Sequence, residues 1–352
     1  MKKYSAVGID VSDKDMKLIG LDDAGEVCLR RVVAATHDAI GEAFGEMEHT
    51  VIALETGGHT GWIARILLQL GHEVVVANTR KVRAISCNEV KTDWRDAEIL
   101  ARLVRSDRKL LHPVILRSEQ TQCDMNVLKA RDALVRSRTL LVCTTRSLVK
   151  NVGERVKACS AESFARHCRE EVSEKTRQTL LGVLDALDTL NRQIAWYDGC
   201  IERVAESRYW EPIQKMRQIV GVGPITSLAF TLCVENPNRF KPRRQIGPYL
   251  GMTPRRDQSG EIDKQLGITP AGPEMARRLL VSAAHYIMGP FGPDTDLKRF
   301  GEHLMQRGGK NAKKRAIVAV ARKLAVLMLT LWQKNEVYEP LRNERMKGTV
   351  AA

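Results

Sequence analysis

The fold is decided by the N-terminal stretch YSAVGIDVSDKDMKLIGLDDAGEVCLRRVV, residues 4–33. Three short apolar, β-rich runs occupy residues 4–10, 16–22 and 27–33, and polar, turn-like breaks separate them. Three strands joined by such short turns predict an antiparallel meander.

After this stretch the pattern alternates between strand and helix. It predicts a helix at about 37–48, a strand at 50–55, a helix at 60–70, a strand at 73–77 and helical sequence from residue 79 onward. Strand–helix–strand units of this length favour parallel strands joined by crossover helices. The combined order βββαβαβα is that of the ribonuclease-H-like α/β fold, which nucleases, transposases and actin-like kinases share.

Four acidic residues fall where this topology would bring them together. Asp10 and Glu55 end two strands that we expect to be parallel neighbours, and α/β sheets place their sites at such carboxyl ends. Asp93 and Asp96 follow Thr92, a candidate N-cap, at a spacing that puts both carboxylates on one helix face. For each acid alone, a turn or a helix N-terminus is a strong alternative explanation.

Carboxylates that converge repel one another, so such a cluster needs cations at neutral pH. Magnesium is the expected ion, with Mn²⁺ as an alternative, because it takes oxygen ligands and can bridge the attacking and leaving oxygens of a phosphate. The opening at residues 8–17 also resembles the first phosphate loop of actin-like and sugar kinases. Those proteins need a second, glycine-rich loop in a second similar domain, whereas this chain turns into heptads.

The composition favours a polyanionic partner. Lys and Arg number 56 against 42 acidic residues in 352, a formal net charge of +14, and a chain of this length suggests two or three domains. The eight cysteines form no Cys-x-x-Cys, which excludes the usual zinc spacings and a disulfide framework. No signal peptide is evident, and the apolar segment 316–332 is interrupted by Arg322 and Lys323, so we expect a buried helix and a soluble, cytoplasmic protein without membrane contacts.

The middle of the chain, about 118–207, is almost entirely helical in pattern. Apolar residues recur every seventh position in two series, Val127, Leu134, Leu141 and Leu148, then Leu180, Leu187, Ile194 and Ile201. Such series predict either a coiled-coil seam suited to dimer contacts or an antiparallel helical hairpin within one chain, with about equal weight.

The last third contains a candidate helix-hairpin-helix at residues 219–229. Its glycines, Gly221 and Gly223, would let backbone N–H groups approach a phosphate, although a plain helical connection explains them too. Basic residues that could hold nucleic acid follow closely: Arg239, Lys241, Arg243, Arg244, Arg255 and Arg256. Ser259 precedes Gly260 beside the last two arginines, and without an activating setting it would be only a turn residue.

The chain resembles bacterial insertion-sequence transposases of the DEDD type, the IS one-ten family with its IS eleven-eleven branch. The resemblance is carried by GIDVS at 8–12, LETG at 54–57, KTDWRDA at 91–97, IVGVGP at 219–224, YLGMTP at 249–254 and QSG at 258–260. It implies a RuvC-like DEDD domain over residues 1–110, a coiled-coil linker and dimerisation region over 111–210, a mainly helical transposase domain over 211–335 and a tail over 336–352.

The resemblance also implies roles for particular residues and partners. Asp10, Glu55, Asp93 and Asp96 would be the metal-binding quartet, and Ser259 would form a covalent 5′-phosphoserine link to DNA. The expected partners are donor and target DNA, a structured guide RNA encoded by the element, and further copies of the chain in a dimer or tetramer. A resolvase-like endonuclease that uses only the quartet is the alternative, and a non-catalytic nucleic-acid scaffold is a third hypothesis.

Overall fold

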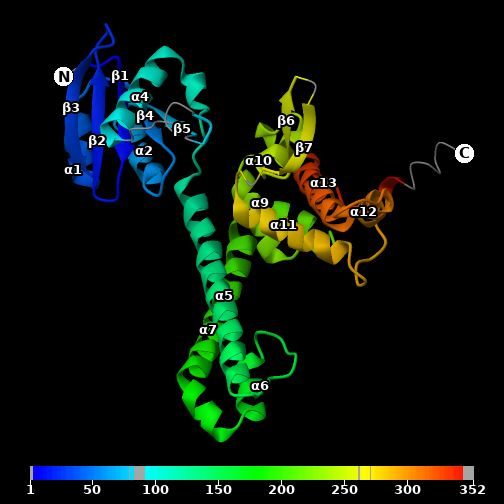
Figure 1. The fold of residues 1–352 in the computed structure, drawn as a ribbon. Helices are drawn as coiled ribbons and strands as arrows, with labels where there is room; N and C mark the ends of the chain where they lie inside the picture. The colour runs from blue at the N-terminus through cyan, green and yellow to red at the C-terminus, as the bar shows by residue number, and fades with distance from the viewer. Residues whose placement is uncertain (1–2, 79, 83–91, 261, 270, 344–352) are drawn as a thin grey trace, which may run out of the picture. The chain divides into compact units, whose positions relative to one another are not determined.

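The computed structural model describes residues 3–78, 80–82, 92–260, 262–269 and 271–343 (Figure 1). The chain divides into two compact units, Met1–Gln120 and Thr121–Ala352. The domain boundaries predicted at residues 110, 210 and 335 remain predictions. The helix expected from residue 79 onward lies partly outside the described residues, as does Lys91 of the motif KTDWRDA.

The first unit is built on a mixed sheet of five strands in the order β3-β2-β1-β4-β5. The strands are β1 (Ala6–Val11), β2 (Asp15–Leu21), β3 (Val27–Ala34), β4 (Val51–Glu55) and β5 (Glu73–Ala77). The pairs β1–β2 and β2–β3 are antiparallel, whereas β1–β4 and β4–β5 are parallel. The predicted meander and the predicted parallel neighbours are therefore confirmed.

Helices cover both faces of this sheet. Helices α1 (His37–Gly45) and α2 (Thr60–Gln69) pack their buried residues on one face, with Phe44 at 0% exposure in that core. Helix α4 (Asp93–Ser106) packs on the other face, over β1, β2 and β4, and the short helix η1 (Arg108–Leu111) follows it. The carboxyl ends of β1 and β4 lie at one edge of the resulting layers.

The approach of α4 to β1 depends on Gly8. A Cβ at this position would overlap the carbonyl oxygen of Ala97 and come within 2.5 Å of the amide nitrogen of Ala101. Both atoms belong to the backbone of α4, so no side-chain rotation could relieve the overlap. The helix can lie this close to the strand only because residue 8 has no side chain.

Gly8→Ala should therefore force α4 away from the sheet and destabilise the first unit by about 3 kcal/mol, the cost of overpacking a tight core. That loss corresponds to a fall of roughly 10 °C in the Tm of this unit, measurable by calorimetry. The control is Gly41→Ala in α1, where a Cβ would meet no atom within 4 Å and should stabilise the helix slightly. Equal Tm values for the two variants would contradict the close-approach argument.

The second unit begins with a helical hairpin. Helices α5 (Glu119–Asn151) and α7 (Glu174–Arg208) run antiparallel, and α6 (Phe164–Glu171) lies between them in sequence. Of the two alternatives, the structure has the intrachain hairpin. On α5 the companion positions Leu128, Val142 and Val149 are the buried ones, whereas Leu148 is 43% exposed.

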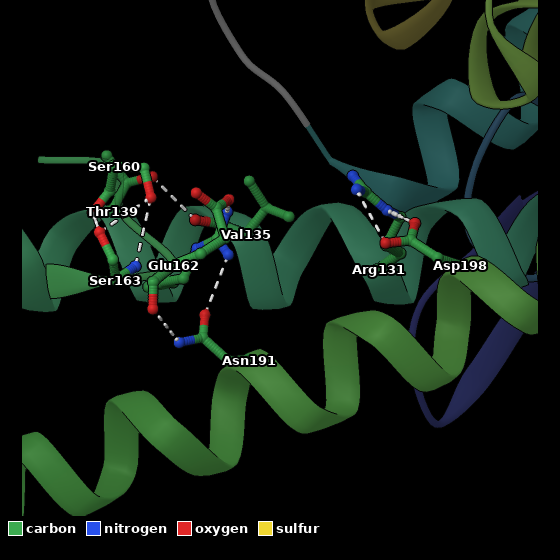
Figure 2. A network of polar contacts seen from close by, with 9 residues as sticks. Arg131, Val135, Thr139, Ser160, Glu162, Ser163, Asn191 and Asp198 are labelled. Atoms are coloured by element: carbon green, nitrogen blue, oxygen red, sulfur yellow. Dashed lines mark hydrogen bonds and ion pairs between the residues drawn. The ribbon is translucent and has the colours of Figure 1, made fainter. Parts of the chain in front are cut away.

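Polar contacts tie the two long helices together (Figure 2). The guanidinium of Arg131 on α5 pairs with Asp198 on α7. Arg138 donates to the side-chain oxygen of Asn191 at 3.0 Å, and Asn191 donates in turn to the carbonyl of Glu162 at 2.9 Å. These bonds fix the register of the hairpin and anchor its connecting segment.

The remaining α-helices form one apolar core with the base of the hairpin, and two short 3-10 helices without buried residues lie among them in the chain. They are α8 (Trp210–Met216), α9 (Pro224–Val234), the short helices η2 (Pro237–Arg239) and η3 (Arg243–Gln245), α10 (Ile246–Tyr249), α11 (Glu274–Ile287), α12 (Asp296–Gln306) and α13 (Ala312–Lys334). Helix α13 is long and apolar enough to cross a membrane by composition, but its central residues, such as Leu324 and Met328, are 0% exposed within this core. The prediction of a buried helix is confirmed.

A two-stranded antiparallel sheet, β6 (Pro254–Ser259) and β7 (Ile262–Ile268), is inserted between α10 and α11. The sequence analysis did not predict this hairpin. Its first strand is exposed along its whole length, so the apolar alternation that marks a half-buried strand is missing from its sequence.

Candidate active site

The sheet of the first unit sets Asp10 beside Glu55. In the parallel pair β1–β4, Ile9 lies opposite Leu54, so the next residue of each strand falls at the same level. Glu55 is the last residue of β4, and Asp10 is the last but one of β1. The two carboxylates therefore belong to the carboxyl edge, as the sequence predicted.

Helix α4 contributes the other two acids from its first turn. Thr92 caps the helix, since its hydroxyl accepts from the amide of Arg95 at 3.4 Å, which confirms the predicted N-cap. Asp96 is buried, at 4% exposure, whereas the side chain of Asp93 is 52% exposed. The backbone amides of a helix N-terminus favour negative charge at both positions.

The electrostatics of Asp10 show that the four acids influence one another. The pKa of its carboxyl is raised from 3.8 to about 6, first by burial and then by the negative charges of Glu55, Asp93 and Asp96, in that order. The nearby ammonium of Lys17 acts in the opposite direction. Folding thus crowds negative charge at this edge and makes Asp10 harder to ionise than a free aspartate.

Lys17 is part of this cluster, although the sequence analysis did not include it among the site residues. It lies directly opposite Asp10 in the antiparallel pair β1–β2, and its ammonium forms an ion pair with the carboxylate of Asp93. That hydrogen bond is the main reason why the pKa of Lys17 is raised. The sequence contains enough information to predict this position, because a hairpin centred on Asp13 and Lys14 pairs residue 10 with residue 17.

The donor chemistry of the edge suits a hard divalent cation, which prefers carboxylate oxygens. Among the residues that the structure describes, however, no three acidic, histidine or cysteine side chains lie close enough to hold one metal ion together. The ion pair between Lys17 and Asp93 accounts for part of this arrangement, since it turns one carboxylate toward an ammonium. A metal ion held by these acids would therefore require their side chains to change position.

Asp10→Asn tests this crowding. The raised pKa means that folding favours the protonated acid, so the stability of the wild type should fall as pH rises from about 4 to about 6 and stay low above that range. The neutral amide removes the penalty. In EDTA at pH 7.5 the variant should gain on the order of 1 kcal/mol, or a few degrees in Tm, after allowance for screening by water.

At pH 4 the difference between wild type and Asp10→Asn should largely vanish, because the wild-type carboxyl is then protonated. Glu48→Gln is the control, because Glu48 is exposed and precedes β4 at the opposite edge of the sheet. An unchanged or lower Tm for Asp10→Asn at pH 7.5 would show that the acids do not repel one another.

Ser259 lies at the tip of the β6–β7 hairpin in the second unit. It is the last residue of β6, pairs with Ile262, and is exposed. Gly260 follows in the left-handed region at φ +55°, a conformation that favours glycine in a tight turn. The hydroxyl is accessible to a polymeric substrate, because a hairpin tip meets little of the protein.

The sequence suggested Arg255 and Arg256 as the cations beside Ser259, but in the structure Arg256 is paired with an acid. Arg256 binds Asp263 through a forked ion pair, with 2.7 Å between Nε and Oδ1, and alternation along the strand puts it on the face opposite Ser259. Lys264 pairs with Asp257, two residues from Ser259, and so lies on the face of the serine. Neither Lys264 nor Lys17 was predicted, because each comes close to its site only by pairing with a residue of the neighbouring strand.

The candidate helix-hairpin-helix connects α8 to α9. Gly221 has φ +93°, and a Cβ there would crowd Tyr286 and the carbonyl of Ala283 on α11, so packing accounts for this glycine. Gly223 is the N-cap of α9, and a Cβ added there would meet no atom within 4 Å, so the space beside this glycine is open. The phosphate-binding hypothesis therefore depends on Gly223 more than on Gly221.

The basic residues after α9 fall into two groups. Arg239 lies over the rings of Phe240 and Tyr249, at 4.8 and 4.6 Å, and Arg243 donates to Gln333, so both are engaged in packing. Three further cations of the predicted set are exposed: Lys241, Arg244 and Arg255.

Known proteins resemble this chain along most of its length. The profile of an IS110 transposase family, described as "Transposase", matches residues 7–153, and the profile described as "Transposase IS116/IS110/IS902 family" matches residues 213–296. The transposase for insertion sequence element IS1111A of Coxiella burnetii is 28% identical over 96% of this chain and 92% of its own length. A probable family 20 transposase of Pseudomonas aeruginosa is 26% identical over 96% of this chain and 99% of its own.

Proposed function

Because this chain belongs to the IS110 family of insertion-sequence transposases, we propose that it cuts and rejoins DNA by phosphoryl transfer at two centres. The first is the carboxyl edge of the sheet, with Asp10, Glu55, Asp93 and Asp96. The second is the hydroxyl of Ser259. The observation that carries the proposal is the placement of Asp10 and Glu55 at the carboxyl ends of adjacent strands, with Asp93 and Asp96 in the first turn of the helix that packs across them. The raised pKa of Asp10, to which the other three carboxylates contribute, agrees with this placement.

The first unit is proposed to have the ribonuclease-H-like fold. The support is its strand order β3-β2-β1-β4-β5, with the antiparallel meander on one side of β1 and the parallel strands on the other. This arrangement follows the element order that the sequence predicted. It also accounts for the place of the acids, at strand ends and on the helix that packs across β1.

We assign Mg²⁺, with Mn²⁺ as an alternative, to the four acids. A bound divalent ion would neutralise the carboxylates and polarise a DNA phosphate. Glu55 and Asp10 present oxygens from adjacent strands, and Asp96 is held by its burial on α4. Lys17 would give up its ion pair with Asp93 when the cation enters, and could then face a phosphate oxygen.

Ser259 would act as the nucleophile. Its oxygen attacks a DNA phosphorus and the bond from phosphorus to the 3′ oxygen breaks. The departing 3′ oxygen takes up a proton in place of the one that the serine hydroxyl gives up, so a free 3′ hydroxyl results. The resulting 5′-phosphoserine is then attacked by the 3′ hydroxyl of another strand, which restores the serine and leaves the number of phosphodiester bonds unchanged. No external energy source is needed, because each step exchanges one phosphate ester for another.

The proposed partners are donor and target DNA, a structured guide RNA and further copies of the chain. A formal charge of +14 supports contacts with nucleic-acid backbones, whose phosphates attract such a protein without regard to sequence. The exposed cations after α9 and in β6 add local positive charge beside Ser259 in sequence. Base pairing by an RNA would then supply the sequence selection.

Ser259→Ala tests the covalent step. A recombination assay with donor and target plasmids, run with the native flanking DNA of the element, should show a loss of at least about 10³-fold, because no other hydroxyl replaces the nucleophile. Denaturing gels of wild type should show a protein–DNA adduct that the variant lacks. Ser137→Ala, at an exposed position of α5, is the control and should recombine normally.

The outcomes separate the competing hypotheses. If Ser259→Ala recombined at the wild-type level, the serine mechanism would be rejected and a resolvase-like endonuclease that uses the acids alone would be favoured. Normal recombination by Asp10→Asn would reject the acidic centre. If both variants recombined normally, Asp10 and Ser259 would have no catalytic role.

Metal binding is tested apart from activity. Mg²⁺ or Mn²⁺ at millimolar concentration should raise the Tm of the first unit in wild type, since a ligand that binds only the folded state stabilises it. At 100 times the Kd the gain is about 2.7 kcal/mol. Asp10→Asn should lose most of this gain, and an equal gain in both proteins would place the ion elsewhere.

A further inference from the structure

A basic pocket lies near the end of α5, far in sequence from the proposed catalytic residues. It has a volume of about 270 Å³ and is lined by Arg146, Lys150, Arg155 and Val156. Three of its four lining residues are cations from a segment of the chain only ten residues long. None of these cations belongs to the acidic edge or to the segment around Ser259.

The local chain path brings these cations together. Arg146 and Lys150 are four residues apart on α5 and so share a helix face. The helix ends at Asn151, and Gly153, at φ +80°, turns the chain back so that Arg155 joins them. The last carbonyls of α5 are already satisfied, since Val149 accepts from Glu154 at 3.2 Å and Lys150 from Gly153 at 3.0 Å.

The pocket is held in shape by the protein itself. Arg146 donates to the carbonyl of Val156 at 3.0 Å, and its guanidinium lies 4.7 Å from the ring centroid of Phe164. The segment that follows is tied down by Glu162, which pairs with Arg138 on α5 and accepts from Asn191 on α7 (Figure 2). Of the three cations, Arg146 is therefore fixed by the fold, so its side chain loses little entropy when a ligand enters.

The charges of the pocket are not balanced by the part of the chain that the structure describes. Within those residues, none of the three cations forms an ion pair with a carboxylate, although Arg138 and Arg169 nearby are paired with acids. The acid next in sequence, Glu154, accepts instead from the hydroxyls of Ser173 and Thr176, and the bond from Thr176 is the main reason why its pKa is lowered.

A second neighbouring acid is engaged in the same way. Glu171 accepts from the amide of Lys157 at 2.7 Å and contacts the ring of His167. The amide of Lys157 is the main reason why the pKa of Glu171 is lowered. The carboxylates that could have neutralised the pocket thus hold the fold around it. Lys150 and Arg155 remain available to an anion, and Arg146, although it donates to backbone carbonyls, adds an unneutralised positive charge beside them.

We propose that this pocket binds a phosphate of a nucleic-acid backbone and so makes the end of the α5–α7 hairpin a third contact with the substrate or the guide. Guanidinium and ammonium groups converging on a cavity of this size match the charge and donor needs of one phosphodiester. The inference rests on the proposed function, which supplies DNA and RNA as partners. It adds a binding site remote in sequence from the acids and from Ser259.

The test reverses two charges and leaves Arg146 in place, because Arg146 also holds the fold. The full-length variant Lys150→Glu/Arg155→Glu is compared with Lys129→Glu/Arg192→Glu, which makes the same charge change at exposed positions of α5 and α7. Lys129 lies about 30 Å from Lys150 along the helix. Binding to fluorescent duplex DNA and to the element's structured RNA is followed by anisotropy at several salt concentrations.

The pocket variant should bind at least one probe about 10-fold more weakly than the control variant at ~0.15 M salt, and its salt slope should fall by about one to two. Loss on RNA alone assigns the pocket to the guide, loss on DNA alone assigns it to the substrate, and loss on both assigns a backbone contact common to them. Calorimetry checks that both variants keep the wild-type Tm.

Equal binding by the pocket and control variants overturns the inference, whether both match wild type or both are weakened alike. In that case the cations of the pocket contribute only to the positive electrostatic potential of the protein as a whole. If wild type itself binds neither probe, the proposed function fails before the pocket is tested. The two failures are therefore distinguishable in one set of titrations.

Discussion

The acidic edge of this protein depends on one close contact, that of the α4 backbone against Gly8 of β1. Because no side chain separates them, the first turn of α4 can reach the carboxyl ends of β1 and β4. Asp96 is buried there and Asp93 meets Lys17, so the contact sets both the position and the charge of the cluster. A wider spacing between strand and helix would leave the same acids in the sequence but out of range of one another.

That contact has an electrostatic cost. Burial and three neighbouring carboxylates disfavour the ionised form of Asp10, whereas the ammonium of Lys17 favours it. Stability is thus reduced where charge is concentrated, which is the pattern expected of a site rather than of a structural ion-pair network. The second unit shows a related pattern, since the pocket at the end of α5 gathers cations while the nearby acids hold the fold.

Much of the first unit was predictable, because its local signals agree with its tertiary structure. The strands Val27–Ala34 and Glu73–Ala77 and the cap at Thr92 appear almost where apolar runs and capping residues predicted them. The β6–β7 hairpin was not predictable in this way, because an exposed strand needs no apolar face. Lys17 and Lys264 were missed because their importance lies in pairing across a strand, not in their own neighbourhood.

The sequence by itself determined the order of elements, the acids at strand ends and at a helix N-terminus, the surplus of positive charge and the resemblance to a transposase family. These follow from short-range periodicity, capping and composition, which operate within a few residues. Only the tertiary structure decided that the heptads close on each other within one chain, that Gly221 serves packing, and that Arg256 is bound by Asp263. Each of these depends on residues from different elements meeting, and a linear pattern does not encode which charges will be paired after the chain has folded.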